Sequence, residues 1–136
     1  MSTETKLQAV FGTTTTPAAD AEHTATAVNG LTLKTSSTNN CYKGWDSTGG
    51  IKIKNDALTI SGLSTTKDFT ITINVAKGGS SRGLTIKDSS SSLATTGTSN
   101  DLAKGNWTSD SIRSTSGTIT INASNDIVIG SITIAQ

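Results

Sequence analysis

Apolar and polar side chains alternate strictly between Asp68 and Val75, in the sequence Asp-Phe-Thr-Ile-Thr-Ile-Asn-Val. Successive side chains of an extended strand point to opposite faces, so this period of two predicts a strand with one buried face and one face in water. Shorter pairs with the same alternation recur at Leu31 and Leu33, Ile51 and Ile53, Leu58 and Ile60, Leu84 and Ile86, Ile119 and Ile121, and Ile132 and Ile134. We therefore expect antiparallel strands packed around a thin aliphatic core.

The spacing of turn residues favours one class of fold. Gly, Asn, Asp and Ser clusters recur about every 8 to 12 residues, and no helical pattern of useful length intervenes. This spacing predicts an all-β fold, an antiparallel β-sandwich of jelly-roll-like type, in preference to a barrel or a repeat solenoid. Within it, Asn55-Asp56 and Ser124-Asn125-Asp126 are expected to be turns between strands, and Gly130 to break or bulge the last one.

The amino-terminal part differs from the rest in composition. A Thr/Pro/Ala tract from Thr13 to Ala19 is typical of a spacer between modules. We expect an irregular N-terminal arm or linker over residues 1–27 and a sandwich domain over residues 28–136. Leu7, Ala9 and Phe11 alternate within the arm and could form a first edge strand on the sheet.

Charge, chain length and the single cysteine exclude several classes of function. A formal net charge of +1 provides no field for steering nucleic acid or an anionic membrane, and no apolar run approaches the length of a membrane span. Cys41 is the only cysteine, so no intrachain disulfide is possible. The segment that begins at Met1 has no apolar signal core, so either the protein stays in the cytosol or this chain is an excised part of a longer one.

No catalytic constellation stands out, and we predict no enzyme activity. His23 is the only histidine, and it lies in the irregular arm, so no serine has the usual base beside it. The loop from Gly78 to Gly83 lacks the Lys-Ser/Thr ending of a phosphate-binding loop. No cofactor is expected except a possible structural Ca²⁺. Its oxygen ligands would come from loop aspartates, although solvated turn residues are the favoured interpretation of Asp46, Asp56, Asp88, Asp101, Asp110 and Asp126.

The few aromatic residues suggest where a ligand could bind. Tyr42, Trp45 and Trp107 lie in stretches that are otherwise polar, which predicts that they belong to loops. An exposed tryptophan in a loop offers a flat apolar face to a sugar ring or a partner. The alternative is that each indole folds back and covers the open end of the core.

Basic residues provide a second candidate surface. Lys52 and Lys54 lie two residues apart, opposite the face of Ile51 and Ile53. If neighbouring strands place further cations on that face, the surface suits a chain of spaced carboxylates, because each ammonium pairs with one carboxylate as a point charge. The alternative is a solvated sheet face with lysines that discourage edge pairing.

Several short strings resemble the accessory β-sandwich domains of secreted bacterial pectate lyases and related polysaccharide-degrading enzymes. They are Asn29-Gly-Leu, Gly50-Ile-Lys-Ile-Lys-Asn, Phe69-Thr-Ile-Thr-Ile-Asn-Val-Ala-Lys, Ser80-Ser-Arg-Gly-Leu-Thr-Ile-Lys-Asp and Asn125-Asp-Ile-Val-Ile-Gly-Ser-Ile-Thr-Ile. The resemblance covers about residues 29 to 135 and includes carbohydrate-binding modules that bind pectin through surface lysines. It implies ligand-binding roles for Lys52, Lys54, Arg82 and Lys87.

Together these observations predict a non-catalytic carbohydrate-binding module for an acidic, pectin-like polysaccharide. Lysines would neutralise carboxylates while Trp45, Tyr42 or Trp107 stacks on a ring. The expected location is extracellular, as a module tethered to a catalytic domain in a longer chain, without nucleic-acid or membrane partners. The alternative is a structural or assembly protein, such as a filament subunit or phage decoration protein, that uses the N-terminal arm to add a strand to a neighbour.

Overall fold

The computed structural model describes residues 4–10, 24–25, 31–35, 41–46, 50–79, 81–89, 91–95 and 104–136. These residues contain β-strands and no helix, which confirms the predicted all-β class. The strands are β1 (Thr5–Val10), β2 (Thr24–Ala25), β3 (Thr32–Thr35), β4 (Cys41–Asp46), β5 (Gly50–Ser61), β6 (Thr70–Lys77), β7 (Leu84–Asp88), β8 (Ser91–Thr95), β9 (Gly105–Thr108) and β10 (Thr118–Ala135).

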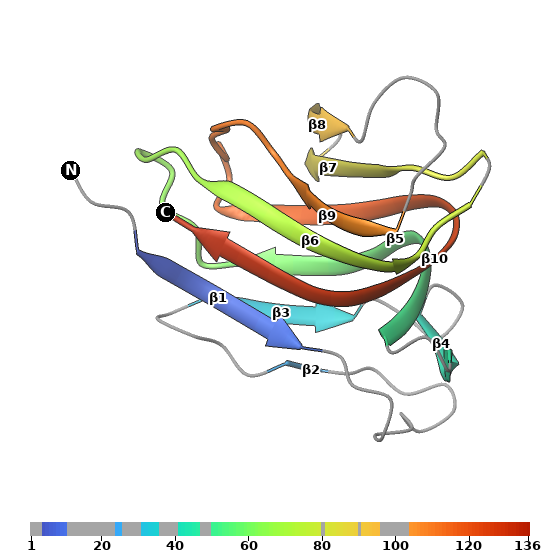
Figure 1. Ribbon diagram of the computed structural model, residues 1–136. Helices are drawn as coiled ribbons and strands as arrows, with labels where there is room; N and C mark the ends of the chain where they lie inside the picture. Colours follow the sequence, from blue (N-terminus) through green and yellow to red (C-terminus); the bar gives the residue numbers. More distant parts are fainter. Residues whose placement is uncertain are drawn as a thin grey trace.

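The long strands β5 and β10 hold the sheet together (Figure 1). β10 pairs with β5 from Thr118 to Ile129, with β7 along its first half, and with β6 and β1 along its second half. β8 and β9 then extend the sheet from β7 and β6, while β3 and β4 pair with β5, and β2 with β3. All pairs are antiparallel, and the bent sheet gives a sandwich-like fold.

The core follows the alternation of the sequence. Phe69, Ile71, Ile73 and Val75 are all buried, whereas Thr70, Thr72 and Asn74 are only partly covered on the other face of β6. The shorter alternating pairs join the same core from β3, β5, β7 and β10 and the residue preceding β3: Leu31, Leu33, Ile51, Ile53, Leu58, Ile60, Leu84, Ile86, Ile119, Ile121, Ile132 and Ile134. The predicted thin aliphatic core is confirmed.

Two expected turns are instead bends inside long strands. Asn55-Asp56 lies within β5, and the segment from Ser124 to Asp126 lies within β10. Asn55 has the left-handed φ of 56°, which explains its turn-like character. Because Asn55 pairs with Ala123, immediately before the bend of β10, both strands change direction at the same place and their pairing continues beyond it.

Gly130 marks a β-bulge, as the sequence predicted. Ile129 pairs with Val75 and Ser131 with Asn74, so β10 has one extra residue here. An extra residue reverses the phase of a period-two pattern, and the buried positions of β10 accordingly pass from Ile129 to Ile132.

Part of the N-terminal arm forms the strand on the sheet that its alternating residues predicted. Thr5–Val10 form β1, which pairs with the last residues of β10, and Leu7 is fully buried in the core. The alternation of Leu7 with Ala9 accounts for this strand. The Thr/Pro/Ala tract lies outside the described residues.

Candidate functional site

A cationic depression of about 160 Å³ lies where β5, β10 and β6 run side by side. It is lined by Lys52, Lys77, Arg82, Asp126 and Val128. The lining therefore contains three cationic side chains and one carboxylate. We call this set of five residues the cationic depression.

Strand register places its two lysines. Lys52 of β5 and Lys77 of β6 both pair with Val128 of β10, from opposite sides. Val128 is 2% exposed but does not belong to the main core cluster, so it forms an apolar base between the two cations. The aliphatic stems of lysine can cover such a base while the ammonium groups remain near water.

A glycine-rich loop after β6 brings in Arg82. Its Nη1 donates to the carbonyl oxygen of Gly78 over 3.2 Å, which holds the side chain across its own loop. A Cβ at Gly79 would lie 3.2 Å from the Arg82 side chain, so the guanidinium packs closely over this glycine. Gly79 also has a φ of 153°, a value that favours glycine.

The same loop is tied to the bend of β10. The amide of Gly83 donates to Ser124 Oγ over 2.9 Å, and the amide of Ser124 donates to the carbonyl oxygen of Gly83 over 3.0 Å. Asp126 lies two residues beyond Ser124 and completes the depression. Its Oδ2 is 3.8 Å from Lys52 Nζ, and both side chains are partly exposed.

Two polar atoms of the depression lack a hydrogen-bond partner among the described residues. They are Arg82 Nε, a donor, and Asp126 Oδ1, an acceptor, and both are buried. A buried polar atom without a partner typically costs about 1–3 kcal/mol. The depression thus combines an excess of positive charge with one unused donor and one unused acceptor.

Only some of the predicted cationic residues come together. Lys52 and Arg82 both line the cationic depression, and Lys54 lies two residues along the outward face of β5. Lys87 lies apart, at the position of β7 that pairs with Thr120, in the first half of β10. The four residues therefore do not form one continuous binding surface.

Lys87 is engaged in a contact of its own. Its Nζ donates to Asp56 Oδ1 over 2.9 Å, and Asn122 Nδ2 donates to the same oxygen over 2.7 Å. These bonds, with that from Lys87 the stronger influence, lower the pKa of the Asp56 carboxyl. The ion pair is partly exposed, so it is expected to contribute little to stability.

Sequence reasoning missed Lys77 and Asp126. Continued alternation from Val75 would place Lys77 on the core face, but Ala76 is an extra residue in the pairing with β10. This bulge turns Lys77 outward. The sequence contained one sign of the bulge, because uninterrupted alternation would have buried the charged Lys77 side chain. Asp126 was interpreted as a turn residue or a calcium ligand, and not as part of a site with the lysines.

Trp107 lies on a strand, which corrects its placement in a loop. It belongs to β9, pairs with the buried Ile73, and packs half-buried against the core. A second depression of about 190 Å³ includes Trp107 together with Leu93 and Asp110. The indole therefore covers an edge of the core, as in the second interpretation of the sequence, and its use as a sugar platform stays a prediction.

Tyr42 and Trp45 are also in a strand where a loop was expected. The backbone of β4 pairs with β5, with Tyr42 opposite Lys52. The pairing with β5 explains why this polar stretch is extended. Their side chains lie outside the described part of the structure.

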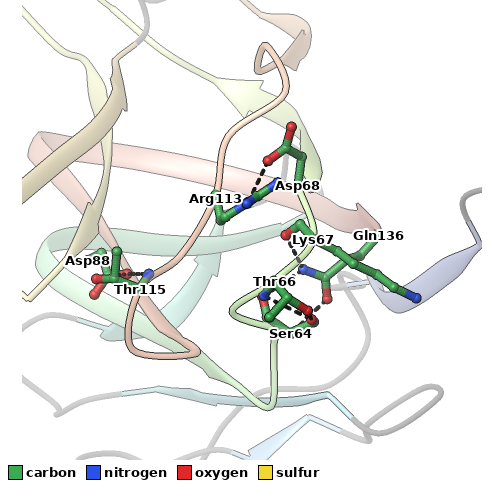
Figure 2. Close-up of polar contacts among 8 residues, drawn as sticks. All are labelled: Ser64, Thr66, Lys67, Asp68, Asp88, Arg113, Thr115 and Gln136. Atoms are coloured by element: carbon green, nitrogen blue, oxygen red, sulfur yellow. Dashed lines mark hydrogen bonds and ion pairs between the residues drawn. The ribbon is translucent and has the colours of Figure 1, made fainter.

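A buried carboxylate at the end of β7 has a structural role. Asp88 accepts hydrogen bonds from Ser116 Oγ at 2.6 Å, Ser114 Oγ at 2.7 Å and the Thr115 amide at 2.6 Å, the last shown in Figure 2. The bonds from Ser116 and Ser114 hold the pKa of the Asp88 carboxyl far below its usual range. Asp88 is thus an ionised anchor for the segment before β10, with both oxygens occupied.

Other polar contacts in Figure 2 fasten the loop between β5 and β6. The buried side chain of Gln136 accepts from the Ser64 amide at 2.9 Å and donates to the carbonyl oxygens of Ser64 and Lys67, each at 3.0 Å. Asp68 accepts from Arg113 Nε at 2.8 Å. These side chains bind the protein's own backbone or each other.

The described residues contain no group of three or more His, Cys, Asp or Glu side chains placed to hold a metal ion. Of the loop aspartates that could supply calcium ligands, Asp56 and Asp88 are engaged in the contacts given above, and Asp101 lies outside the described residues. A structural Ca²⁺ stays a prediction.

No protein-family model matches the chain, and a comparison with curated proteins finds no match. Among the described residues, none forms a helix long and apolar enough to cross a membrane.

Proposed function

We propose that this protein is a non-catalytic carbohydrate-binding module that binds an acidic, pectin-like polysaccharide at the cationic depression. The observation that carries the proposal is the convergence of Lys52, Lys77 and Arg82 around one carboxylate, that of Asp126. A polymer of uronic acids presents one carboxylate on each sugar unit. Each ammonium or guanidinium group can pair with one such carboxylate.

The size of the depression fits this class of ligand. Its volume of about 160 Å³ lies below the roughly 300–1,000 Å³ of pockets that enclose a drug-sized molecule. A depression of this size suits one unit of a long chain laid across the sheet. Lys54 would meet the chain as it continues along β5, and Tyr42, whose backbone faces Lys52, would lie on its path.

Calorimetry with polygalacturonate tests the proposal. We expect weak binding that declines as ionic strength rises from about 0.01 M to about 1 M, because the Debye length falls from about 30 Å to about 3 Å. Lys52→Ala should weaken binding about fivefold, the upper range for a partly exposed ion pair. Lys67→Ala is the matched control, because Lys67 is exposed and lies outside the depression.

Two results would count against this function. If polygalacturonate gives no binding heat at either ionic strength, the proposed function is wrong. Equal losses in Lys52→Ala and Lys67→Ala would show that only the net charge of the protein matters, and not the depression.

Use of the arm for assembly with other copies has less support. The segment Thr5–Val10 already pairs with β10 of its own chain. Assembly would therefore require another strand edge of the sheet, or the exchange of β1 between neighbouring copies.

A further inference from the structure

We propose that the cationic depression selects hexuronate units over other polyanions, because Asp126 accepts a hydrogen bond from a sugar hydroxyl while Arg82 donates one to the sugar's oxygens. This inference rests on the proposed function and assigns the ligand's polar groups to named atoms. It makes Asp126, the one acidic residue of the site, a residue that determines specificity.

The argument starts from the two unpartnered atoms. Arg82 Nε is a donor without an acceptor and Asp126 Oδ1 is an acceptor without a donor, and both belong to side chains that line the same depression. Arg82 Nη1 donates to the carbonyl oxygen of Gly78, and Asp126 Oδ2 lies 3.8 Å from Lys52 Nζ, which leaves Arg82 Nε and Asp126 Oδ1 as the buried atoms of the two side chains without a partner among the described residues. A ligand that satisfies both must present an acceptor and a donor together.

Uronate sugars have this combination of groups. Arg82 Nε and Asp126 Oδ1 are covered in the unliganded protein, whereas their side chains are partly exposed. When these side chains turn toward the ligand, its carboxylate can accept from Arg82 Nε and a ring hydroxyl can donate to Asp126 Oδ1. Inorganic polyphosphate, which has charged acceptors and no comparable hydroxyl donors, can satisfy only Arg82. Beside such a ligand the Asp126 carboxylate is merely repulsive.

The direction in which Asp126→Ala changes the binding affinity distinguishes an Asp126 that accepts a hydrogen bond from one that only repels the ligand. Asp126→Ala removes a negative charge from the site, so electrostatics alone should tighten the binding of any polyanion by about two- to fivefold. If Asp126 accepts a hydrogen bond from the ligand, the same substitution should instead weaken polygalacturonate binding by about tenfold. We therefore expect opposite changes for polygalacturonate and for polyphosphate.

The experiment measures both ligands by calorimetry at low ionic strength, with wild type, Asp126→Ala and Asp126→Asn. Asparagine removes the same charge but keeps a carbonyl acceptor, so it should bind polygalacturonate more tightly than Asp126→Ala does. Asp68→Ala is the control, because it removes an exposed carboxylate that is bonded to Arg113, away from the depression. Circular dichroism checks that each variant is folded.

A ligand-side measurement keeps the test valid if Asp126→Ala does not fold. Polygalacturonate acetylated on its ring hydroxyls keeps its carboxylates and loses its donors, so wild type should bind it about tenfold more weakly. If the Asp126→Ala change has the same sign for both ligands, or acetylation has no effect, the inference is overturned while the proposed function stands. If wild type does not bind polygalacturonate at all, both are overturned.

Discussion

The substitution Asp88→Asn should lower the free energy of unfolding by about 2–4 kcal/mol. Asp88 is 4% exposed, and its carboxylate oxygens accept from Ser114 Oγ, the Thr115 amide and Ser116 Oγ at 2.6–2.7 Å. Asparagine has nearly the same shape, so the substitution changes charge and hydrogen bonding with little change in volume.

The magnitude follows from what asparagine can still accept. With its amide turned so that the carbonyl oxygen replaces Oδ2, asparagine keeps the bonds from the Thr115 amide and the Ser114 hydroxyl. Its Nδ2 can then donate to Ser116 Oγ, whose hydroxyl donates to the carbonyl oxygen of Thr118 over 3.0 Å. What asparagine loses is the charge: a hydrogen bond to a charged acceptor contributes about 1.5–3 kcal/mol and a neutral one about 0.5–1.5 kcal/mol, so three such bonds together lose about 2–4 kcal/mol.

The pH dependence gives an independent check. The pKa of Asp88 in the folded protein lies far below its value of about 3.9 in unfolded chains, so the unfolded state binds more protons between these values. The stabilisation is therefore complete above about pH 4–5 and is lost as pH falls further. The free energy of unfolding of Asp88→Asn should therefore decline less than that of wild type as pH falls below about 4.

Guanidinium denaturation followed by circular dichroism at pH 7 and pH 3 measures both effects. Asp68→Asn is the control, because Asp68 is half exposed and should contribute less than about 1 kcal/mol. An Asp88→Asn protein with the midpoint of wild type at pH 7, or with the same loss of stability at pH 3, would refute this account of the anchor.

Two further substitutions test the loops beside the sheet. Gly117→Ala should lower the free energy of unfolding by about 1–3 kcal/mol, because Gly117 has a φ of 83° and a Cβ would lie 3.0 Å from the carbonyl oxygen of Leu63. An unchanged midpoint of thermal unfolding would contradict this prediction. Gln136→Ala removes three hydrogen bonds to the backbone of residues 64–67 and should cost about 1–3 kcal/mol, with faster hydrogen exchange at the Ser64 amide as the local measurement. Unchanged exchange there would show that another contact holds the loop.

The sequence predicts the core well because burial leaves a periodic trace. At Phe69, Ile71 and Ile73 each inward position needs an apolar side chain, and each intervening position tolerates a polar one. The pattern needs no knowledge of which strand lies beside which. The core could therefore be inferred residue by residue.

The lengths of β5 and β10 could not be inferred in this way. Asn55 and the segment from Ser124 to Asp126 have the residue types of hairpin turns. Whether such residues reverse the chain or bend it depends on whether a partner strand bends beside them. That is a long-range property, and no local pattern contains it.

The cationic depression was only half predicted for a related reason. Lys52 could be placed because it lies between two buried isoleucines of one strand. Lys77 and Asp126 join it through the register of three strands, and that register depends on the extra residues at Ala76 and near Asp126. A one-residue slip would move each side chain to the other face.

Three irregular features of the backbone meet at the cationic depression. The bulge at Ala76 turns Lys77 outward, the bend of β10 carries Asp126, and the Gly83–Ser124 contact ties the loop of Arg82 to that bend. Bulges commonly re-aim side chains next to functional sites, whereas a sheet that only had to cover a core would be more stable with regular pairing. We therefore interpret these irregularities as the structural means by which three separate segments present charge at one place.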